Sequence, residues 1–311
     1  MDARITKQRL GNLLSYDWLK ILVSIAAAVV ALVLFFTMVG TRPTAGQTFT
    51  VYGYSDVKPG ADVGYLPGNL EDTNVFSYDI LKIQSESFYG NTYAGAAYEA
   101  RRSSGEGTVM FVSDYAKDDG NDETKEVGTL SAMAANSLRP DPDSETGYTM
   151  YLFYSPVKFM DDAAKYLAAF FEGDWRTAET LKEAKVRETF ETRNGSDKRY
   201  RFSSSKFEEG VADEARRIKK LRDDFLVVEQ AFQEGKLSCT EYTDENGLTY
   251  PIAVNLSRLS SITSLYYYED AEGSRSAELL NLIIFENYDR LGDLKYDTVS
   301  FLKYLVEKYG S

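Results

Sequence analysis

Histidine is absent from this chain of 311 residues, and cysteine occurs once, as Cys239. Without histidine there is no Ser-His-Asp or Cys-His catalytic centre, no histidine-ligated zinc and no imidazole general base. A single cysteine also excludes an intrachain disulfide, which fits an extracytoplasmic bacterial protein better than one secreted through an oxidising compartment. We expect Cys239 to be a small buried apolar residue rather than a nucleophile.

Positive charges are outnumbered: 35 Lys and Arg stand against 48 Asp and Glu, so the net charge is −13. So acidic a chain lacks the electrostatic footprint of a nucleic-acid-binding protein. The acidic stretches 116–128 and 140–147 do not have the residue spacing of an EF-hand, so we expect solvated loops and no bound metal. The remaining acids do not single out a catalytic pair, and we expect neither an enzyme nor a cofactor.

One long apolar run is present. Residues 21–41 carry no charge, and a helix of this length spans roughly 30 Å, the thickness of the hydrocarbon core of a bilayer. A signal-peptide core is shorter, about 7–15 residues. Four basic residues precede the run, so the positive-inside rule places residues 1–20 in the cytoplasm and residues 42–311 outside the cell membrane. We therefore predict a single-pass anchor.

A cleaved signal peptide is the alternative interpretation of the same run. Small residues at Thr44-Ala45-Gly46 allow cleavage before Gln47. A lipid anchor is excluded, because no cysteine stands directly after the run to take the lipid. After cleavage the mature protein would begin at Gln47.

The segment beyond a short linker, 42–47, predicts parallel strands joined by a helix. Residues 48–56 and 76–88 are rich in β-branched and aromatic residues, and residues 108–115 have a continuous apolar core, as in a strand buried on both faces. A helix is predicted over 91–107, with Asn91 as its N-cap. Between the first two strands, residues 58–74 predict a loop without a clear helix.

The middle of the chain, residues 116–249, is predicted to be mainly helical. Helices are expected near 129–138, 156–172, 177–192 and 208–235. The last carries an apolar residue every seven positions, at Val211, Ile218, Phe225 and Phe232. Such a stripe predicts a core-facing helix, with coiled pairing as the alternative.

The chain then returns to β structure. Asn246-Gly247 predicts a hairpin turn, 264–270 a strand, and 278–287 either a strand or part of a helix. A final helix is predicted over 297–310 with Asp297 as its N-cap. The predicted organisation is an α/β lobe made of 48–115 plus 250–311 and a mainly helical lobe, 116–249.

Three segments resemble those of periplasmic-binding-protein-like, extracellular solute-binding proteins: TFTVYGYSD at the first strand, GEGTVMFVSDY at the third, and YDTVSFLKYLVEKYG at the terminal helix. The resemblance implies a two-lobed α/β ectodomain with a helical middle. The stretches LSYDWLKIL and KVRETFETRNGSDKRYR are also similar to uncharacterised membrane-anchored proteins of clostridial-type bacteria. This second likeness implies a location at the membrane and says little about ligands or reactions.

Polar residues follow the predicted strands at their carboxyl ends, where open α/β sheets bind ligands. The candidate ligand-binding residues are Tyr54, Ser55, Asp56, Glu86, Ser87, Ser113, Asp114 and Tyr115. Carboxylates, hydroxyls and tyrosines suit a neutral or cationic polar solute, such as a sugar, an amine or a peptide. The alternative is that these residues end strands in solvent.

Two further clusters admit two interpretations each. Tyr266-Tyr267-Tyr268 predicts either ordinary strand residues or a stacking platform, and strand alternation would turn the middle ring away from the outer two. The basic cluster Lys198-Arg199-Tyr200-Arg201 predicts either a solvated patch or a docking site for a partner protein.

Taken together, these features predict a membrane-anchored, extracytoplasmic solute-binding-like protein. It would act as a receptor or as an accessory subunit of a membrane transporter, with a permease or another membrane protein as its partner. The competing hypothesis is a non-enzymatic interaction ectodomain that docks a membrane partner without a small ligand.

Overall fold

The computed structural model describes residue 11 and residues 18–39, 43, 45–116, 127–140, 148–150, 153–286 and 292–310. The chain divides into two compact units, Met1–Arg42 and Pro43–Ser311. In the first unit, α2 (Trp18–Val39) is a continuous helix of 22 residues. By length and composition it is able to cross a membrane, a criterion that a signal sequence near an N-terminus also meets. Most of both predicted acidic loops, 117–126 and 141–147, lies outside the described residues.

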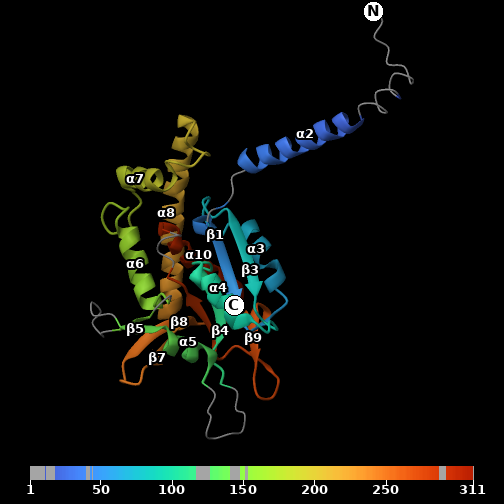
Figure 1. Ribbon diagram of the computed structural model, residues 1–311. Coiled ribbons are helices and arrows are strands. Elements are labelled where there is room, and N and C mark those ends of the chain that lie inside the picture. Colours follow the sequence, from blue (N-terminus) through green and yellow to red (C-terminus); the bar gives the residue numbers. More distant parts are fainter. Residues whose placement is uncertain are drawn as a thin grey trace, which may run out of the picture. The chain divides into compact units, whose positions relative to one another are not determined.

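A six-stranded mixed sheet forms the centre of the second unit, in the order β3-β1-β4-β11-β8-β7 (Figure 1). Two smaller sheets accompany it, β10-β9-β2 and the pair β5-β6. The strands are β1 (Thr48–Gly53), β2 (Lys58–Pro59), β3 (Lys82–Ser87), β4 (Val109–Ser113), β5 (Leu138–Pro140), β6 (Tyr148–Met150), β7 (Ser238–Thr243), β8 (Thr249–Asn255), β9 (Tyr266–Glu269), β10 (Arg275–Ser276) and β11 (Leu280–Ile284).

The described helices of the second unit pack around this sheet. The α-helices are α3 (Leu66–Asp72), α4 (Ala94–Ser103), α5 (Thr129–Ser137), α6 (Pro156–Ala168), α7 (Glu183–Asn194), α8 (Ser204–Gln233) and α10 (Thr298–Tyr309). Short 3-10 helices are η1 (Ala45–Gln47), η2 (Val63–Tyr65), η3 (Ile262–Ser264) and η4 (Gly292–Asp297).

The predicted parallel pairing is confirmed. β1 lies between β3 and β4 and is parallel to both. Because the chain places β3 on one side of β1 and then crosses to place β4 on the other, the strand order reverses between β1 and β4. This is the topological switch point at which open α/β sheets bind ligands, outside the carboxyl ends of the strands.

Strand alternation divides the core between the two faces of the sheet. Phe49 and Val51 of β1 pack toward α3, α6, α8 and α10. Tyr52 of the same strand packs with α4 and α5 on the opposite face. Neither core contains a residue before Phe49. The second unit therefore has a core of its own, and we expect residues 43–311 to fold without the first.

The prediction of a helix-free loop over 58–74 is wrong, because α3 occupies part of it. Pro67 stands in the first turn of α3, where its missing N–H costs nothing. Leu66 and Leu70 fix the helix against the sheet and are fully buried. The stretch is too short to show a helical period, and its Gly and Pro residues favoured a loop.

Two predicted helix caps are also corrected. The N-cap of α4 is Tyr93 rather than Asn91, whose Oδ1 instead accepts a hydrogen bond from the Tyr93 amide at 2.9 Å. Asp297 does stand at the N-cap of α10, but its side chain makes no cap bond. Its carboxylate pairs with Arg217 instead, because a buried guanidinium is the stronger partner.

The β7–β8 hairpin is confirmed, with Gly247 in the left-handed region at φ 79°. Residues 280–284 form the strand β11, which resolves the predicted ambiguity. The stripe on α8 faces the core, since Ile218 and Phe225 are buried with it. The sequence prediction placed β7 in the helical lobe. Among the described residues, β7 is instead one of the two edge strands of the main sheet. The two-lobed division stays a prediction.

A buried ionic network joins the helices α7 and α8 to η4 and to the segment before β3. Arg193 of α7 reaches Asp79, Asp293 and Glu214, and Asp79 and Glu214 are fully buried. Arg217 of α8 bonds Glu214 at 3.0 Å and Asp297 at 3.2 Å. These groups come from four separate segments, so the network fixes how the helical middle sits on the α/β part.

The basic cluster contributes to the same network. Arg199 pairs with Asp79 at 2.9 Å and with Asp197, so it faces inward rather than solvent. Tyr200 packs edge-on against Phe190 of α7. Only part of the cluster is therefore available to a partner, which limits the docking interpretation to its outer residues.

Candidate functional site

The residues that follow β1 and β4 meet at the switch point. The Tyr54 amide donates to the carbonyl of Phe111 at 2.9 Å and so extends the pairing of β1 with β4. Beyond it, the Asp56 carboxylate crosses to β4. The predicted site residues of these two strands are thus neighbours, although 57 positions separate Asp56 from Ser113.

Asp56 is the central group of this cluster. Its Oδ2 accepts hydrogen bonds from the amide and the hydroxyl of Ser113, each at 2.8 Å. Its Oδ1 is enclosed and has no hydrogen bond of good geometry among the described residues, although the nearby Thr129 hydroxyl lowers the pKa of the carboxyl. Burial raises the pKa of Asp56 above its ordinary value, and the bonds from Ser113 do not offset that effect. A buried acceptor without a partner is costly, and such groups gather at functional sites.

Asp114 holds the N-terminus of α5 against the end of β4. Its Oδ1 accepts from the Ser131 amide at 2.9 Å and its Oδ2 from the Ser131 hydroxyl at 2.8 Å. Gly128 precedes the helix, and a Cβ there would overlap the carboxylate and the carbonyl of Asp114. The glycine therefore allows the close approach of the helix to the strand.

The charges of the cluster would disfavour an anion. A helix N-terminus at a switch point commonly holds a bound anion, but here Asp114 already occupies it. An incoming anion would meet two carboxylates. A hydroxyl or an ammonium group would instead supply the donor that Oδ1 of Asp56 lacks.

Tyrosines frame the same edge of the sheet. Tyr115 stacks on Tyr268 with ring centroids 5.0 Å apart, and Tyr54 meets Tyr98 edge-on at 5.5 Å. Burial raises the pKa of Tyr98 to about 12, so its hydroxyl stays protonated. Tyr266, Tyr267 and Tyr268 are all buried, which fits ordinary strand residues better than an open platform.

Glu86 and Ser87 lie one strand away and are bonded locally. Glu86 pairs with the exposed Arg101 of α4 at 3.2 Å. The Ser87 hydroxyl accepts a hydrogen bond from the Tyr89 amide at 3.3 Å. Ser87 is level with Gly53 in the parallel register. The structure therefore brings together Asp56, Ser113 and Asp114, and leaves Glu86 and Ser87 at the margin.

Sequence reasoning missed the contribution of α5. Ser131 supplies both donors to Asp114, and the Thr129 hydroxyl lies close enough to Asp56 to lower its pKa. The signal was the stretch Gly-Thr-Leu-Ser, since Ser and Thr in a first helical turn point to a terminus that faces another group.

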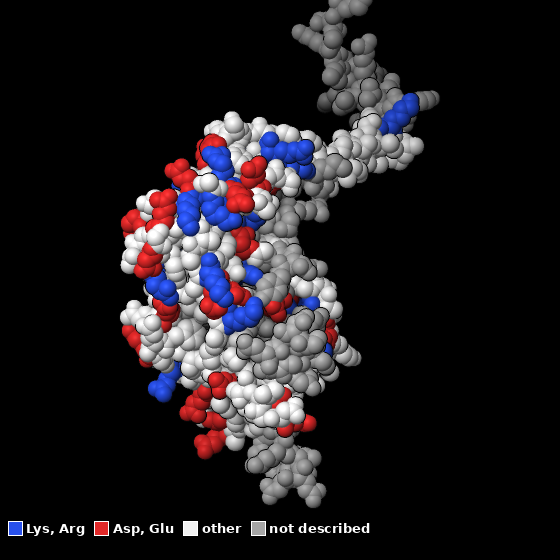
Figure 2. All heavy atoms as spheres, turned by 90° about the vertical axis from the view of Figure 1, so that its left-hand side faces the viewer, with Lys and Arg blue, Asp and Glu red and all other residues white. Residues whose placement is uncertain are grey.

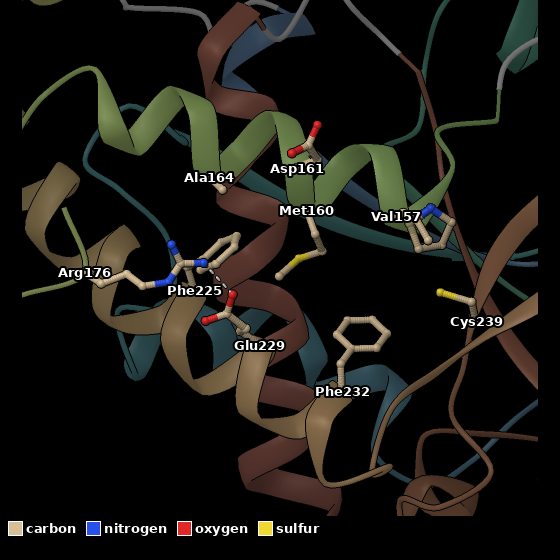
Figure 3. Close-up of a pocket in the computed structure, with 10 residues that line it drawn as sticks. Val157, Met160, Asp161, Ala164, Arg176, Phe225, Glu229, Phe232 and Cys239 are labelled. Atoms are coloured by element: carbon tan, nitrogen blue, oxygen red, sulfur yellow. Dashed lines mark hydrogen bonds and ion pairs between the residues drawn. The ribbon is translucent and has the colours of Figure 1, made fainter. Parts of the chain in front are cut away.

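A separate groove of about 300 Å³ runs between α6 and α8 (Figure 3). Met160, Phe225 and Phe232 line its apolar walls, and an Arg176–Glu229 ion pair of 2.7 Å lies at one end. Cys239 lies at the other end in Figure 3. Cys239 is half-buried, and burial raises the pKa of its thiol, which opposes a nucleophilic thiolate. Among the described residues, no group of three or more Asp, Glu or Cys is placed to hold a metal ion.

No protein-family model matches the chain, and no curated protein matches it. Among solved structures, the chain is similar to a probable secreted solute-binding lipoprotein from Streptomyces coelicolor. The two are 13% identical, with 87% of this chain and 82% of that chain covered and a TM-score of 0.26. A TM-score this low does not establish a shared fold or a shared function.

Proposed function

We propose that the chain is a membrane-anchored protein whose α/β unit binds a polar solute at the switch point. The observation that carries this proposal is the enclosed, unpartnered Oδ1 of Asp56 between the carboxyl ends of β1 and β4. A solute that donates an N–H or O–H bond to this oxygen would offset a cost that the ligand-free fold bears. The proposed solute is an amine, a sugar or a peptide amine, and not an anion.

The proposed placement follows from α2. The helix is long enough to span a bilayer, and the basic residues before it favour a cytoplasmic position for residues 1–20. The α/β unit is then extracytoplasmic. There it would serve as a receptor or as an accessory subunit of a transporter permease. The proposed role is binding without catalysis, since the sequence has no histidine and Cys239 is kept as a thiol.

Thermal-shift screening of residues 43–311 against amines, sugars and short peptides tests the proposal. One of these classes should raise the melting temperature, by an amount that grows with the logarithm of the ligand concentration above the dissociation constant. Asp56→Asn should abolish the shift. Glu86→Gln, at the margin of the site, should retain it.

A flat screen with every class, or equal shifts for the wild type and Asp56→Asn, would count against the site. The melting temperature of Asp56→Asn itself is an independent check. Because Asn carries no charge, the variant should melt within a few degrees of the wild type. A collapse of the fold would instead show that Asp56 is structural.

Docking to a membrane protein is the second candidate function. The observation that favours it is Phe202, which is 81% exposed between α7 and α8, with the guanidinium of Arg201 near its ring. Basic and acidic side chains intersperse over the face shown in Figure 2. Such a face suits a partner of mixed charge. Co-purification of a membrane protein that is lost in Phe202→Ser would support this function.

A further inference from the structure

A cavity of about 290 Å³ opens between the end of α3 and the helices α8 and α10. Three lysines line it, Lys220, Lys303 and Lys308. Such a gathering is unexpected in a chain with a net charge of −13. The cavity shares no residue with the cluster around Asp56, and its chemistry is different.

The buried carboxylate of Asp224 binds two of these lysines, Lys220 and Lys303. It is 2% exposed, and its Oδ2 accepts from Lys220 Nζ at 2.6 Å and from the Ser300 hydroxyl at 2.6 Å. Its Oδ1 pairs with Lys303 at 3.2 Å. Lys220 also donates to the carbonyl of Val75 at 2.7 Å. One buried carboxylate thus holds two ammonium groups at fixed positions before any ligand arrives.

Positive charge remains at the mouth of the cavity. Lys220 is saturated by its partners, but Lys303 has only the 3.2 Å contact to Asp224 and a 3.5 Å contact to the exposed Glu307. Lys308 lines the cavity and forms no ion pair or hydrogen bond among the described residues. Three lysines against two carboxylates leave an excess of one positive charge, which lies on Lys308 and on the more weakly paired Lys303 of α10.

Asn74 adds a neutral polar group to the opposite wall. It is the one described residue other than glycine with a positive φ, 48°. Asparagine tolerates this left-handed conformation better than most residues. Its side chain offers both a donor and an acceptor to the cavity. The wall facing the lysines is therefore suited to an uncharged polar part of a ligand.

We propose that this cavity binds a small organic carboxylate. The carboxylate lies between Lys303 and Lys308, whose charges attract it, while the Asn74 amide bonds a polar group at the other end of the ligand. The cavity volume exceeds that of a single water-sized ion severalfold, so it accommodates a carbon skeleton. This site is separate from the proposed solute site and prefers the opposite charge.

The test is isothermal titration calorimetry on the full chain in uncharged detergent, with succinate as the probe at constant ionic strength. Lys303→Gln and Lys308→Gln should each weaken binding by about three- to fivefold, the range for partly exposed charge pairs. Lys236→Gln is the matched control, because Lys236 is an exposed lysine paired with Glu234 away from the cavity. It should leave the affinity unchanged.

Asn74→Gly separates a ligand-binding role of Asn74 from a structural one. Glycine accepts φ 48° without strain, so the melting temperature should hold while succinate affinity falls. No measurable succinate binding would overturn the proposal, as would an equal loss in Lys236→Gln. Inorganic phosphate binding as tightly as succinate would overturn the assignment to an organic ligand. Tighter binding of ethylenediamine would overturn the sign of the charge preference.

Discussion

Arg217→Met is the sharpest test of the buried network. Arg217 is 4% exposed and bonds Glu214, Asp297 and the carbonyl of Asp293. Glu214 would keep Arg193 and Tyr78 as partners. Asp297, which is 2% exposed, would keep only the Ser77 hydroxyl among the described residues. Removing one member of a buried ion pair leaves an uncompensated charge, so we expect a loss of about 3–5 kcal/mol in the free energy of unfolding.

A loss of that size is a large fraction of the roughly 5–15 kcal/mol that stabilises a typical domain. Urea unfolding of residues 43–311 measures it, with Trp175 as the reporter. Trp175 is the one tryptophan of this segment and packs edge-on against Phe225 in the core. Arg216→Met is the matched control. Arg216 precedes Arg217 on α8 but is exposed and pairs with Asp213 at the surface, so its loss should cost less than about 1 kcal/mol.

The pH dependence separates lost charge pairing from lost packing. Burial raises the pKa of Asp297 above its ordinary value even with Arg217 present, and without Arg217 it should rise further. A group whose pKa is raised on folding binds a proton more tightly in the folded state, so it adds stability as the pH falls.

The cost of Arg217→Met should therefore shrink between about pH 7 and pH 5. In the wild type Asp293 stays charged over that range, because Arg217 and Arg193 outweigh its burial and lower its pKa. In the variant its ion pair with Arg193 remains. A cost equal to that of Arg216→Met, or one that grows toward pH 5, would refute the reasoning.

Two further predictions concern the anchor and the start of α5. The full chain should stay in the membrane fraction after alkaline carbonate extraction, and external protease should release residues 43–311 from intact cells; a mature N-terminus at Gln47 would instead show cleavage. Gly128→Ala should cost about 1–3 kcal/mol because its Cβ overlaps Asp114. Gly68→Ala, in open space within α3, should stabilise the fold by up to about 1 kcal/mol, and urea unfolding that gave both changes the same sign would contradict the expected contrast.

The parallel sheet was predictable because its signals are local. Val109 to Val112 are apolar without alternation, which indicates a strand covered on both faces, and the structure buries all four. The core-facing stripe on α8 was equally predictable, because an apolar residue at every seventh position of a 30-residue helix is typical of a side that faces the core. By contrast, α3 has seven residues, too few to show a period beside its Gly and Pro.

The site was predictable only in outline. The rule that ligands bind at strand carboxyl ends selected Asp56, Ser113 and Asp114, because each follows or ends a strand. The same rule included Glu86, which the structure pairs with Arg101. The contacts that separate Asp56, Ser113 and Asp114 from Glu86 join segments far apart in the chain, so sequence alone could not reveal them. Arg199 is a second example. Its inward pairing with Asp79 spans 120 positions, a distance over which sequence pattern carries no signal.

The two proposed sites have a joint consequence, because they prefer opposite charges. If one zwitterionic solute bound across a single site, Asp56→Asn and Lys308→Gln would each abolish its binding. The structure instead places the acceptor at the carboxyl ends of β1 and β4 and the lysines between α3, α8 and α10. An amine and a carboxylate should then bind independently, and their stabilising effects should add, since each depends only on its own concentration and dissociation constant. Competition between the two ligands would show that one of the sites has been misassigned.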